Sequence, residues 1–390
     1  MTEWKEYKLG ELIKTNVKSI GRDYPYSKIL YLDTGSITCN NIDSFQEFEL
    51  DKAPSRAKRL VKQDDIIYSS VRPNQLHYGY ITNPQDNLVV STGFVTITCN
   101  KELLCPKFLY YFLIQSQITE YLHSVAEAST SAYPSLKPSD IEALDIEIPP
   151  LDIQHRIASI LSSLDGKIDL LHRENATLEQ MAETMFRQWF VEESKEEWEE
   201  KPLGKCIKLI GGGTPKTSEE RFWNGNVCWL SGGDIANNHK SFVSSSEKSI
   251  SQDGLNNSSA KLLPENAMVV SARGTVGKYC LLSKPMAFSQ SNYGILPIFE
   301  GCYFFTYLLV AYHIDELQSA AYGSVFDTIT TKTFDGVSVL LPQKTSCIVE
   351  FEKMIEPYFS KMKYNKKQIR TLIQTRDGLL GKLMSGEIEI

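Results

Sequence analysis

Two stretches of the chain repeat apolar residues with the period of a coiled coil. In both, the mainly apolar positions are separated by steps that alternate between four and three residues over more than four heptads. The positions are Ile157, Leu161, Leu164, Ile168, Leu171, Asn175, Leu178, Ala182, Met185 and Trp189, and then Phe351, Ile355, Tyr358, Met362, Asn365, Ile369, Leu372, Arg376, Leu379 and Leu383. We predict two long helices within 151–195 and 344–390 that pair as a coiled coil. The alternative is two ordinary amphipathic helices, each buried against a domain.

The two series also predict how the helices pair. In an antiparallel pair, positions whose numbers sum to 540 face each other, which sets Trp189 against Phe351. The same register sets Asn175 against Asn365, and a buried pair of asparagines fixes the register of a coiled coil at some cost in stability. We therefore expect an intramolecular antiparallel pair with these two asparagines as its register residues.

The length of the first helix matters for the whole chain. About 33 residues at ~1.5 Å each make a rod of roughly 50 Å. Two residues disturb the helical pattern. Gly166 weakens the first helix by about 1 kcal/mol, and Pro357 is expected to kink the second helix or to make it begin near Tyr358.

The segments outside the helices combine short apolar runs with turn residues. Ile29–Leu32, Phe94–Thr98 and Met268–Val270 are typical of β-strands, and they are separated by clusters of Gly, Asn, Pro and Ser. Helical segments such as Phe108–Leu122 are mixed with them. We therefore predict a small α+β domain in each of the ranges 1–150 and 196–343.

The chain also repeats itself at about half its length. Trp4 to Gly10 recurs as Trp198 to Gly204 at an offset of 194 residues, and Tyr31 to Ile37 recurs as Trp229 to Ile235 at an offset of 198. Collinear matches at a nearly constant offset indicate a tandem duplication of one domain followed by one helix. The predicted fold is therefore α+β, with two similar domains separated by two long antiparallel helices and a pseudo-two-fold internal repeat.

Composition argues against binding through bulk positive charge. The 390 residues carry a formal net charge of −7, and the two domain ranges carry −4 and −3. Eight cysteines without a C-x-x-C pair, and a start without an apolar leader, predict a cytoplasmic protein with free thiols.

Several motifs resemble those of a known family, the specificity subunits of type I restriction–modification systems. Three of them resemble the opening of that family's target-recognition domain: Gly212-Gly213-Thr214-Pro215-Lys216-Thr217, Phe222-Trp223-Asn224-Gly225 and Trp229-Leu230-Ser231-Gly232-Gly233-Asp234-Ile235. Residues 271–278 resemble its later arginine–glycine segment, and Ile148-Pro149-Pro150-Leu151 with Gln154 and Ile157 resembles the start of its first spacer helix. The first half lacks the Gly-Gly-Thr-Pro run between Thr15 and Tyr26, so we expect the two domains to have different targets.

The resemblance implies a DNA-binding, non-catalytic subunit. Each target-recognition domain would read one half of a bipartite double-stranded DNA target, and the spacer helices would set the gap and dock two adenine methyltransferase subunits. Two ATP-dependent restriction and translocase subunits would join them. The methyl donor, ATP and Mg are expected in those partners, with no cofactor in this chain. Matching groove faces recur about every 34 Å, so a rod of roughly 50 Å suits two sites one to one and a half turns apart.

Candidate DNA contacts are basic and amide side chains in loops, because phosphates favour Lys and Arg and base edges favour Arg, Lys and Asn. The candidates are Arg56, Lys58, Arg59, Arg72 and Asn74 in the first domain, and Lys216, Arg221, Lys240, Arg273 and Lys278 in the second. Arg72 and Arg273 are favoured because each follows a predicted strand at a matching place. The alternative for any one of these residues is simple solvation.

Other function classes receive less support from the sequence. The run Gly211 to Thr217 does not meet the spacing of a phosphate-binding loop, and Pro215 removes an N–H that such a loop would use, so we predict a structural turn there. No catalytic or metal-binding residue is predicted, because the six histidines form no metal-binding pattern. A coiled-coil scaffold that binds only proteins and a specificity subunit of a type IIB-like system remain as alternatives.

Overall fold

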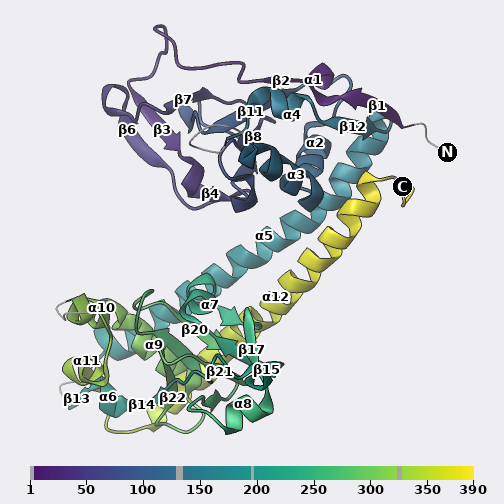
Figure 1. Ribbon diagram of the computed structural model, residues 1–390. Helices are drawn as coiled ribbons and strands as arrows, with labels where there is room; N and C mark the ends of the chain where they lie inside the picture. The colour runs from purple at the N-terminus through teal and green to yellow at the C-terminus, as the bar shows by residue number, and fades with distance from the viewer. Residues whose placement is uncertain (1–3, 129–134, 195–196, 323–326) are drawn as a thin grey trace. The chain divides into compact units, whose positions relative to one another are not determined.

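The computed structural model describes residues 4–128, 135–194, 197–322 and 327–390. By its contacts the chain forms two compact units: Met1–Lys167 with Leu372–Ile390 (unit 1), and Ile168–Thr371 (unit 2). Each unit contains one α+β domain and a part of both long helices (Figure 1). Across the described ranges, no helix is both long enough and apolar enough to cross a membrane.

The domain of unit 1 contains two four-stranded sheets, a two-stranded clasp, and a short hairpin of β4 (Ile37–Thr38) and β5 (Asn41–Ile42). The first sheet has the order β2 (Ile13–Thr15), β11 (Phe94–Cys99), β8 (Ile66–Ser69) and β9 (Tyr78–Tyr80). The second has the order β6 (Gln46–Glu49), β3 (Lys28–Leu32), β10 (Leu88–Ser91) and β7 (Ala57–Leu60), and in it only β3 and β10 are parallel. The clasp pairs β1 (Lys5–Lys8) with β12 (Asp145–Ile148), so the start and the end of the domain are neighbours.

The domain of unit 2 repeats this arrangement. Its first sheet has the order β14 (Ile207–Gly211), β22 (Asn292–Pro297), β19 (Met268–Ser271), β20 (Tyr279–Leu282) and β16 (Phe242–Val243). Its second has the order β17 (Lys248–Ile250), β15 (Trp223–Leu230), β21 (Met286–Phe288) and β18 (Leu262–Leu263). Its clasp pairs β13 (Glu199–Pro202) with β23 (Ser338–Leu341).

The strand pairings confirm the internal repeat at the level of single residues. In unit 1, Tyr31 of β3 pairs in parallel with Val89 of β10, and in unit 2 Trp229 of β15 pairs in parallel with Ala287 of β21. Tyr31 and Trp229 are the positions that the sequence match aligned. The two halves therefore share the same main sheet topology; β16 is an additional edge strand of unit 2, and the β4–β5 hairpin is an addition of unit 1.

Helices pack against the first sheet of each domain. In unit 1 the predicted helical segment Phe108–Leu122 forms two helices, α2 (Pro106–Leu113) and α3 (Ser116–Glu127), rather than one. In unit 2 their counterparts are α9 (Tyr303–Tyr312) and α10 (Ile314–Tyr322), and seven side chains of α9 are buried. Such continuous burial explains why α9 is apolar all round, since helices with a single buried face keep one polar side.

The two long helices are α5 (Leu151–Arg187), which continues as a π-helical turn over Gln188–Glu192, and α12 (Ser346–Met384). Every predicted seam position on both helices is buried or half-buried, which confirms the heptad pattern. Within unit 2 the helices are antiparallel neighbours (Figure 1), and the rings of Trp189 and Phe351 lie 5.7 Å apart in the predicted register.

The alternative to a coiled coil was that each long helix is buried against a domain. At the two ends of α5, this interpretation is also correct. Ile157 and Leu161 belong to the core of unit 1, and Ala182 and Phe186 belong to the core of unit 2, which also contains Phe351. The ends of the helix pair are therefore part of the domain cores.

Pro357 does not mark the start of the second helix. The second helix begins at Ser346 and continues through Pro357, so a start near Tyr358 is wrong. The missing N–H frees the carbonyl of Lys353, but both residues are exposed, so water can serve that carbonyl. Ile355 and Phe359 on either side are fully buried, and this packing holds the turn in place.

Candidate nucleic-acid interface

The two favoured arginines lie in equivalent loops. Hairpin loop 1 (residues 70–77) joins β8 to β9, and hairpin loop 2 (residues 272–278) joins β19 to β20. In each loop the serine that ends the first strand bonds two residues ahead: Ser69 Oγ donates to the carbonyl of Val71 at 2.9 Å, and Ser271 Oγ donates to that of Arg273 at 3.1 Å. Arg72 is therefore one residue beyond the structural counterpart of Arg273.

Each of these arginines is exposed. Arg72 has a positive φ of 48° and precedes a 3₁₀ turn that contains Asn74, also exposed. In loop 2 the positive φ values fall on Gly274 and Gly277, at 76° and 78°, so Arg273 itself keeps an ordinary backbone. Neither arginine forms an ion pair with any residue that the structure describes.

Loop 2 is tied to the motif at residues 229–235. Thr275 Oγ1 lies 2.9 Å from Ser271 Oγ and donates to the carbonyl of Gly232 at 3.2 Å. Gly232 begins α7 (Gly232–Asn237), whose first turn is closed by a capping box between Ser231 and Asp234. The structure thus brings two separate sequence motifs together at the base of the loop that carries Arg273.

The glycine-rich run in unit 2 follows β14 and packs closely against neighbouring backbone. Gly212 and Gly213 lie against the backbones of Ser289 and Ser259, where a Cβ would clash. The indole N–H of Trp229 donates to the carbonyl of Gly213 at 2.9 Å.

The same run leads to Lys216 and Arg221. The indole N–H of Trp223 donates to the carbonyl of Lys216 at 3.1 Å, which leaves the lysine side chain exposed. Arg221 is exposed as well, but its guanidinium lies 3.3 Å from Glu219 and 3.7 Å from Asp253. The positive charge of Arg221 is therefore partly neutralised by these two carboxylates.

The basic cluster of the first domain lies beside hairpin loop 1. The backbone N–H of Thr92 donates to the carbonyl of Arg56 at 2.8 Å. The carbonyl of Gly93, which follows Thr92, accepts from the backbone N–H of Ser70 at 2.8 Å. Arg56 and loop 1 thus both contact the turn of Thr92 and Gly93, which joins β10 to β11. The other two members of the cluster, Lys58 and Arg59, are on the edge strand β7; Lys58 is exposed, whereas Arg59 is half-buried.

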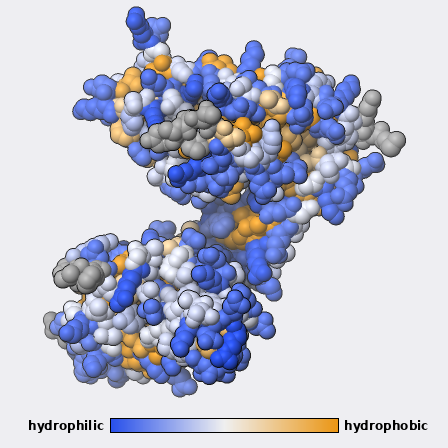
Figure 2. Space-filling model, in the orientation of Figure 1, coloured by the Kyte–Doolittle hydropathy of each residue, from blue (hydrophilic) through white to orange (hydrophobic). Residues whose placement is uncertain are grey.

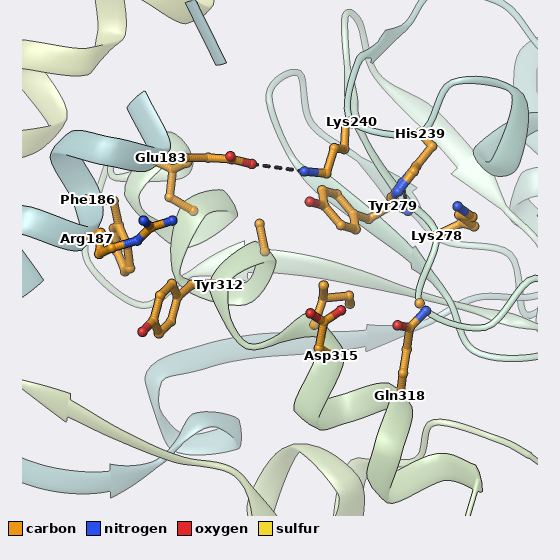
Figure 3. A pocket seen from close by; sticks show the side chains of 14 residues that line it. Glu183, Phe186, Arg187, His239, Lys240, Lys278, Tyr279, Tyr312, Asp315 and Gln318 are labelled. Carbon is orange, nitrogen blue, oxygen red and sulfur yellow. Dashed lines mark hydrogen bonds and ion pairs between the residues drawn. The ribbon is translucent and has the colours of Figure 1, made fainter. Parts of the chain in front are cut away.

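Lys240 and Lys278 line one pocket of about 470 Å³ in unit 2 (Figure 3). Lys240 Nζ lies 3.1 Å from Glu183 Oε1 on α5. His239 Nδ1 accepts from the backbone N–H of Tyr279 at 3.3 Å, and burial, followed by the charge of Lys278, lowers the histidine pKa. Lys240 is thus held by a carboxylate of the long helix, whereas Lys278, the last residue of loop 2, forms no ion pair with any described residue.

The structure also brings the two register asparagines together. Asn365, fully buried on α12, donates from Nδ2 to Asn175 Oδ1 at 2.9 Å and to Glu174 Oε2 at 2.8 Å. In unit 1 the seam contains a charge as well: Arg376 Nη1 lies 2.9 Å from Asp165 Oδ1, and the hydroxyl of Tyr111 donates to the other oxygen of that carboxylate at 2.6 Å.

Two residues that hold loop 2 escaped the sequence reasoning. Thr275 lies inside the segment 271–278, but nothing in that segment's sequence marks it as the residue that ties the loop to Gly232. Gln318 on α10 donates to the carbonyl of Val276 at 2.9 Å, and no local pattern marks it. Among the described residues, no group of three or more His, Cys, Asp or Glu side chains is placed to hold a metal ion.

Comparison with known proteins agrees with this architecture. The family model for the type I restriction modification DNA specificity domain matches residues 1–180 and 195–372. The type I restriction enzyme HindI specificity subunit of Haemophilus influenzae is 27% identical, with 100% of both chains covered. The MjaIX specificity subunit of Methanocaldococcus jannaschii is 24% identical, with 100% of this chain and 97% of the relative covered.

A solved structure shares the fold. The type I restriction–modification system S subunit from M. genitalium superimposes with a TM-score of 0.59 at 16% identity, covering 98% of this chain and 96% of the other. The family match extends over both halves, each with the same sheet topology and the same arginine-bearing hairpin. The chain therefore belongs to the family of type I restriction–modification DNA specificity subunits.

Proposed function

We propose that the two recognition domains, residues 1–150 and 196–343, each read one half of a bipartite double-stranded DNA target. The main support is the repeated hairpin, which in both halves presents an exposed arginine that has no carboxylate partner among the described residues. Arginine is well suited to this task because its guanidinium can bond both O6 and N7 of guanine in the major groove. The two loops differ in sequence and in the placement of the arginine by one residue, so the two half-sites differ.

The remaining candidates fit supporting roles at phosphates. Asn74 lies in hairpin loop 1, Arg56 lies beside that loop, and Lys58 is exposed on the edge strand β7; Lys216 and Lys278 are exposed in loops of unit 2. Phosphate contacts fix the position of a protein on the duplex without reading its sequence. Arg59, Arg221 and Lys240 contribute less directly, because one is half-buried and two are held by carboxylates.

We further propose that α5 and α12 set the gap between the half-sites and dock two adenine methyltransferase subunits. Figure 2 shows a largely hydrophilic surface with hydrophobic residues exposed on the helical segment near α5. Leu170 and Met181 on α5 are 50% and 43% exposed, and they lie about three helical turns apart on one face. Thr177 and Met185 lie beside Met181 on the same face of α5, and this face can take the apolar side of a partner's helix.

The family's function is recognition, and catalysis belongs to the other subunits. Two ATP-dependent restriction and translocase subunits complete the proposed assembly, and the methyl donor, ATP and Mg bind those partners. We place the assembly in the cytoplasm, in keeping with the eight cysteines, all of which are free thiols.

Methylome sequencing of cells with and without this chain tests the proposal. We expect a split motif with methylated adenine in both halves that is present only when the chain is expressed. Loss of the chain without any change in adenine methylation would contradict the proposed function. Appearance of a continuous motif would contradict the two-reader arrangement.

A further inference from the structure

A strongly basic pocket lies in unit 2, and none of its lining residues belongs to the segments 212–235 or 271–278. It has a volume of about 600 Å³ and lies between α12 and the residues that follow β16 and β20. Its lining consists of Ser244, Glu265, Ser283, Lys284, Ser360, Lys363, Tyr364, Lys366, Lys367 and Arg370. Five cationic side chains thus face one carboxylate, and the other four lining residues carry hydroxyl groups.

The charge in this pocket is largely unneutralised. Glu265 is bonded to Lys363, which also donates to Asn266 Oδ1 at 3.3 Å. The other four cations, Lys284, Lys366, Lys367 and Arg370, form no ion pair with any residue that the structure describes. Lys366 is half-buried, and burial lowers its pKa. An ammonium group that is partly removed from water and has no counter-charge is stabilised by a bound anion.

The fold does not require this cluster. At the repeat offset of 194 residues, Lys363, Lys366, Lys367 and Arg370 on α12 correspond to Asp169, His172, Arg173 and Ala176 on α5. The first helix forms the same antiparallel pair with one arginine and one aspartate at these four places. The positive charge is therefore an addition to the second half alone.

We propose that this basic pocket binds a phosphate group of the DNA backbone. Lysine, arginine and serine are the side chains that bond phosphate oxygens in protein–DNA complexes. From Lys363 to Arg370 the cations extend over about 10 Å of helix, which matches the axial length of about three base-pair steps. Two neighbouring phosphates of one strand can therefore be contacted together.

The position of the pocket relative to hairpin loop 2 favours DNA as the source of the phosphate. β20 (Tyr279–Leu282) leads directly from loop 2 to Ser283 and Lys284, and its four residues extend about 13 Å. This distance is less than one helical turn of about 34 Å, so one duplex can contact both places. The inference rests on the proposed function, and it adds a sequence-independent contact made by the second half only.

The salt dependence of DNA binding tests the pocket. The probe is a short duplex without a target site, bound to the full chain assembled with its partner subunits. Replacing two exposed cations, Lys367→Gln with Arg370→Gln, should reduce the slope of log K against log salt by about 2, which is about one unit per lost phosphate contact. Affinity for target and non-target duplexes should fall by the same factor.

Lys167→Gln with Lys353→Gln is the matched control. It removes the same charge from two exposed helix lysines outside the pocket, neither of which is ion-paired to a described residue, and it should leave the slope unchanged. An equal loss of slope in both double variants would overturn the proposal, because it would mean that only net charge matters.

Two further outcomes would also overturn it. If the pocket variant weakens assembly with the partner subunits but not the salt slope, the pocket binds an acidic protein surface. If inorganic phosphate binds the wild-type complex but not the variant in calorimetry, while the DNA slope is unchanged, the pocket binds a free anion. Failure of the proposed function looks different, because the wild-type complex would then show no preference for any split target.

Discussion

Arg273 lies on a loop that is held by several hydrogen bonds, while its guanidinium group is exposed. The loop is fixed by Ser271, Thr275 and Gln318, while the guanidinium meets no carboxylate among the described residues. A side chain that is placed in advance loses little entropy when it binds, and its bond to a base can therefore be specific. Arg72 in the other half has the same freedom on a loop of different sequence.

Substituting Arg273 should affect one half of the target only. Arg273→Ala is expected to cost about 1–3 kcal/mol at one half-site, roughly 5- to 150-fold, and to relax the motif there. Arg72→Ala should do the same at the other half-site and serves as the matched control. Binding to a panel of duplexes with single-position changes measures both effects. If either substitution weakened both half-sites equally, the assignment of one reader to each half would be wrong.

A buried carboxylate makes unit 2 sensitive to pH. Glu179 on α5 accepts the hydroxyl of Tyr307 at 2.7 Å, and burial raises its pKa to about 7 from an ordinary value of 4.5. Because the folded pKa is the higher one, the stabilising contribution is complete below pH 4.5 and is lost as the pH rises through about 7. The free energy of unfolding should therefore fall by about 3 kcal/mol over this range through Glu179 alone.

Glu179→Gln should remove that part of the pH dependence, since the amide oxygen still accepts the hydroxyl. Urea unfolding between pH 5 and pH 8, followed by tryptophan fluorescence, measures it, because four of the five tryptophans lie in unit 2. Glu192→Gln on the π-helical turn that continues α5 is the control, because Glu192 is exposed, and it should keep the wild-type slope. Identical slopes for wild type and Glu179→Gln would refute the role of this carboxylate.

At the scale of elements, the asparagine pair gives the helix pairing its register. Buried asparagines tolerate only a partner that can bond them, so any shift of the helices leaves them unsatisfied. In the same register the next seam layer sets Leu171 against Ile369, and both are buried outside the domain cores. Here the helices have mainly each other to pack against.

Crosslinking tests this register. Asn175→Cys with Asn365→Cys should form an intramolecular bridge under mild oxidation, because the two side chains are in contact at 2.9 Å. Ala176→Cys with Asn365→Cys is the control and should not, since residue 176 points away from the seam and is exposed. Peptide mass analysis separates this bridge from reactions of the exposed Cys39. A bridge that forms only between two copies of the chain would contradict the intramolecular pair.

Sequence reasoning succeeded where the pattern is local and failed where distant contacts decide. The heptad seam was readable because its period depends on neighbours along one helix. The continuity of the helix at Pro357 was not, because it rests on the buried neighbours Ile355 and Phe359. Likewise, the loop positions of Arg72 and Arg273 followed from the strands before them. The pairing of Lys240 with Glu183 joins residues 57 apart and left no trace in the sequence.

At the scale of the whole molecule, charge limits what the chain can do alone. With a net charge of −7 and neither domain basic overall, only local basic sites attract DNA. Such binding depends on a few phosphate contacts and weakens steeply with salt.

We therefore expect the isolated chain to bind target DNA weakly, in a way that added salt abolishes. With the methyltransferase subunits present, the same duplex should bind far more tightly and resist salt better, because the partners enclose it. Fluorescence anisotropy with and without partners, at two salt concentrations, measures the difference. A nanomolar complex of the isolated chain with its target would disprove this expectation.

The two clasps have a consequence for how such a gene changes. β1 pairs with β12 and β13 pairs with β23, so each domain begins and ends at adjacent strands, and the last strand leads into a long helix. In coding terms, everything between the clasp strands is a cassette. Recombination within the sequences that encode the clasps would exchange one cassette for another, while the heptads and the asparagine pair stay intact. A lineage could thus acquire a new half-specificity in one step and keep the other half unaltered.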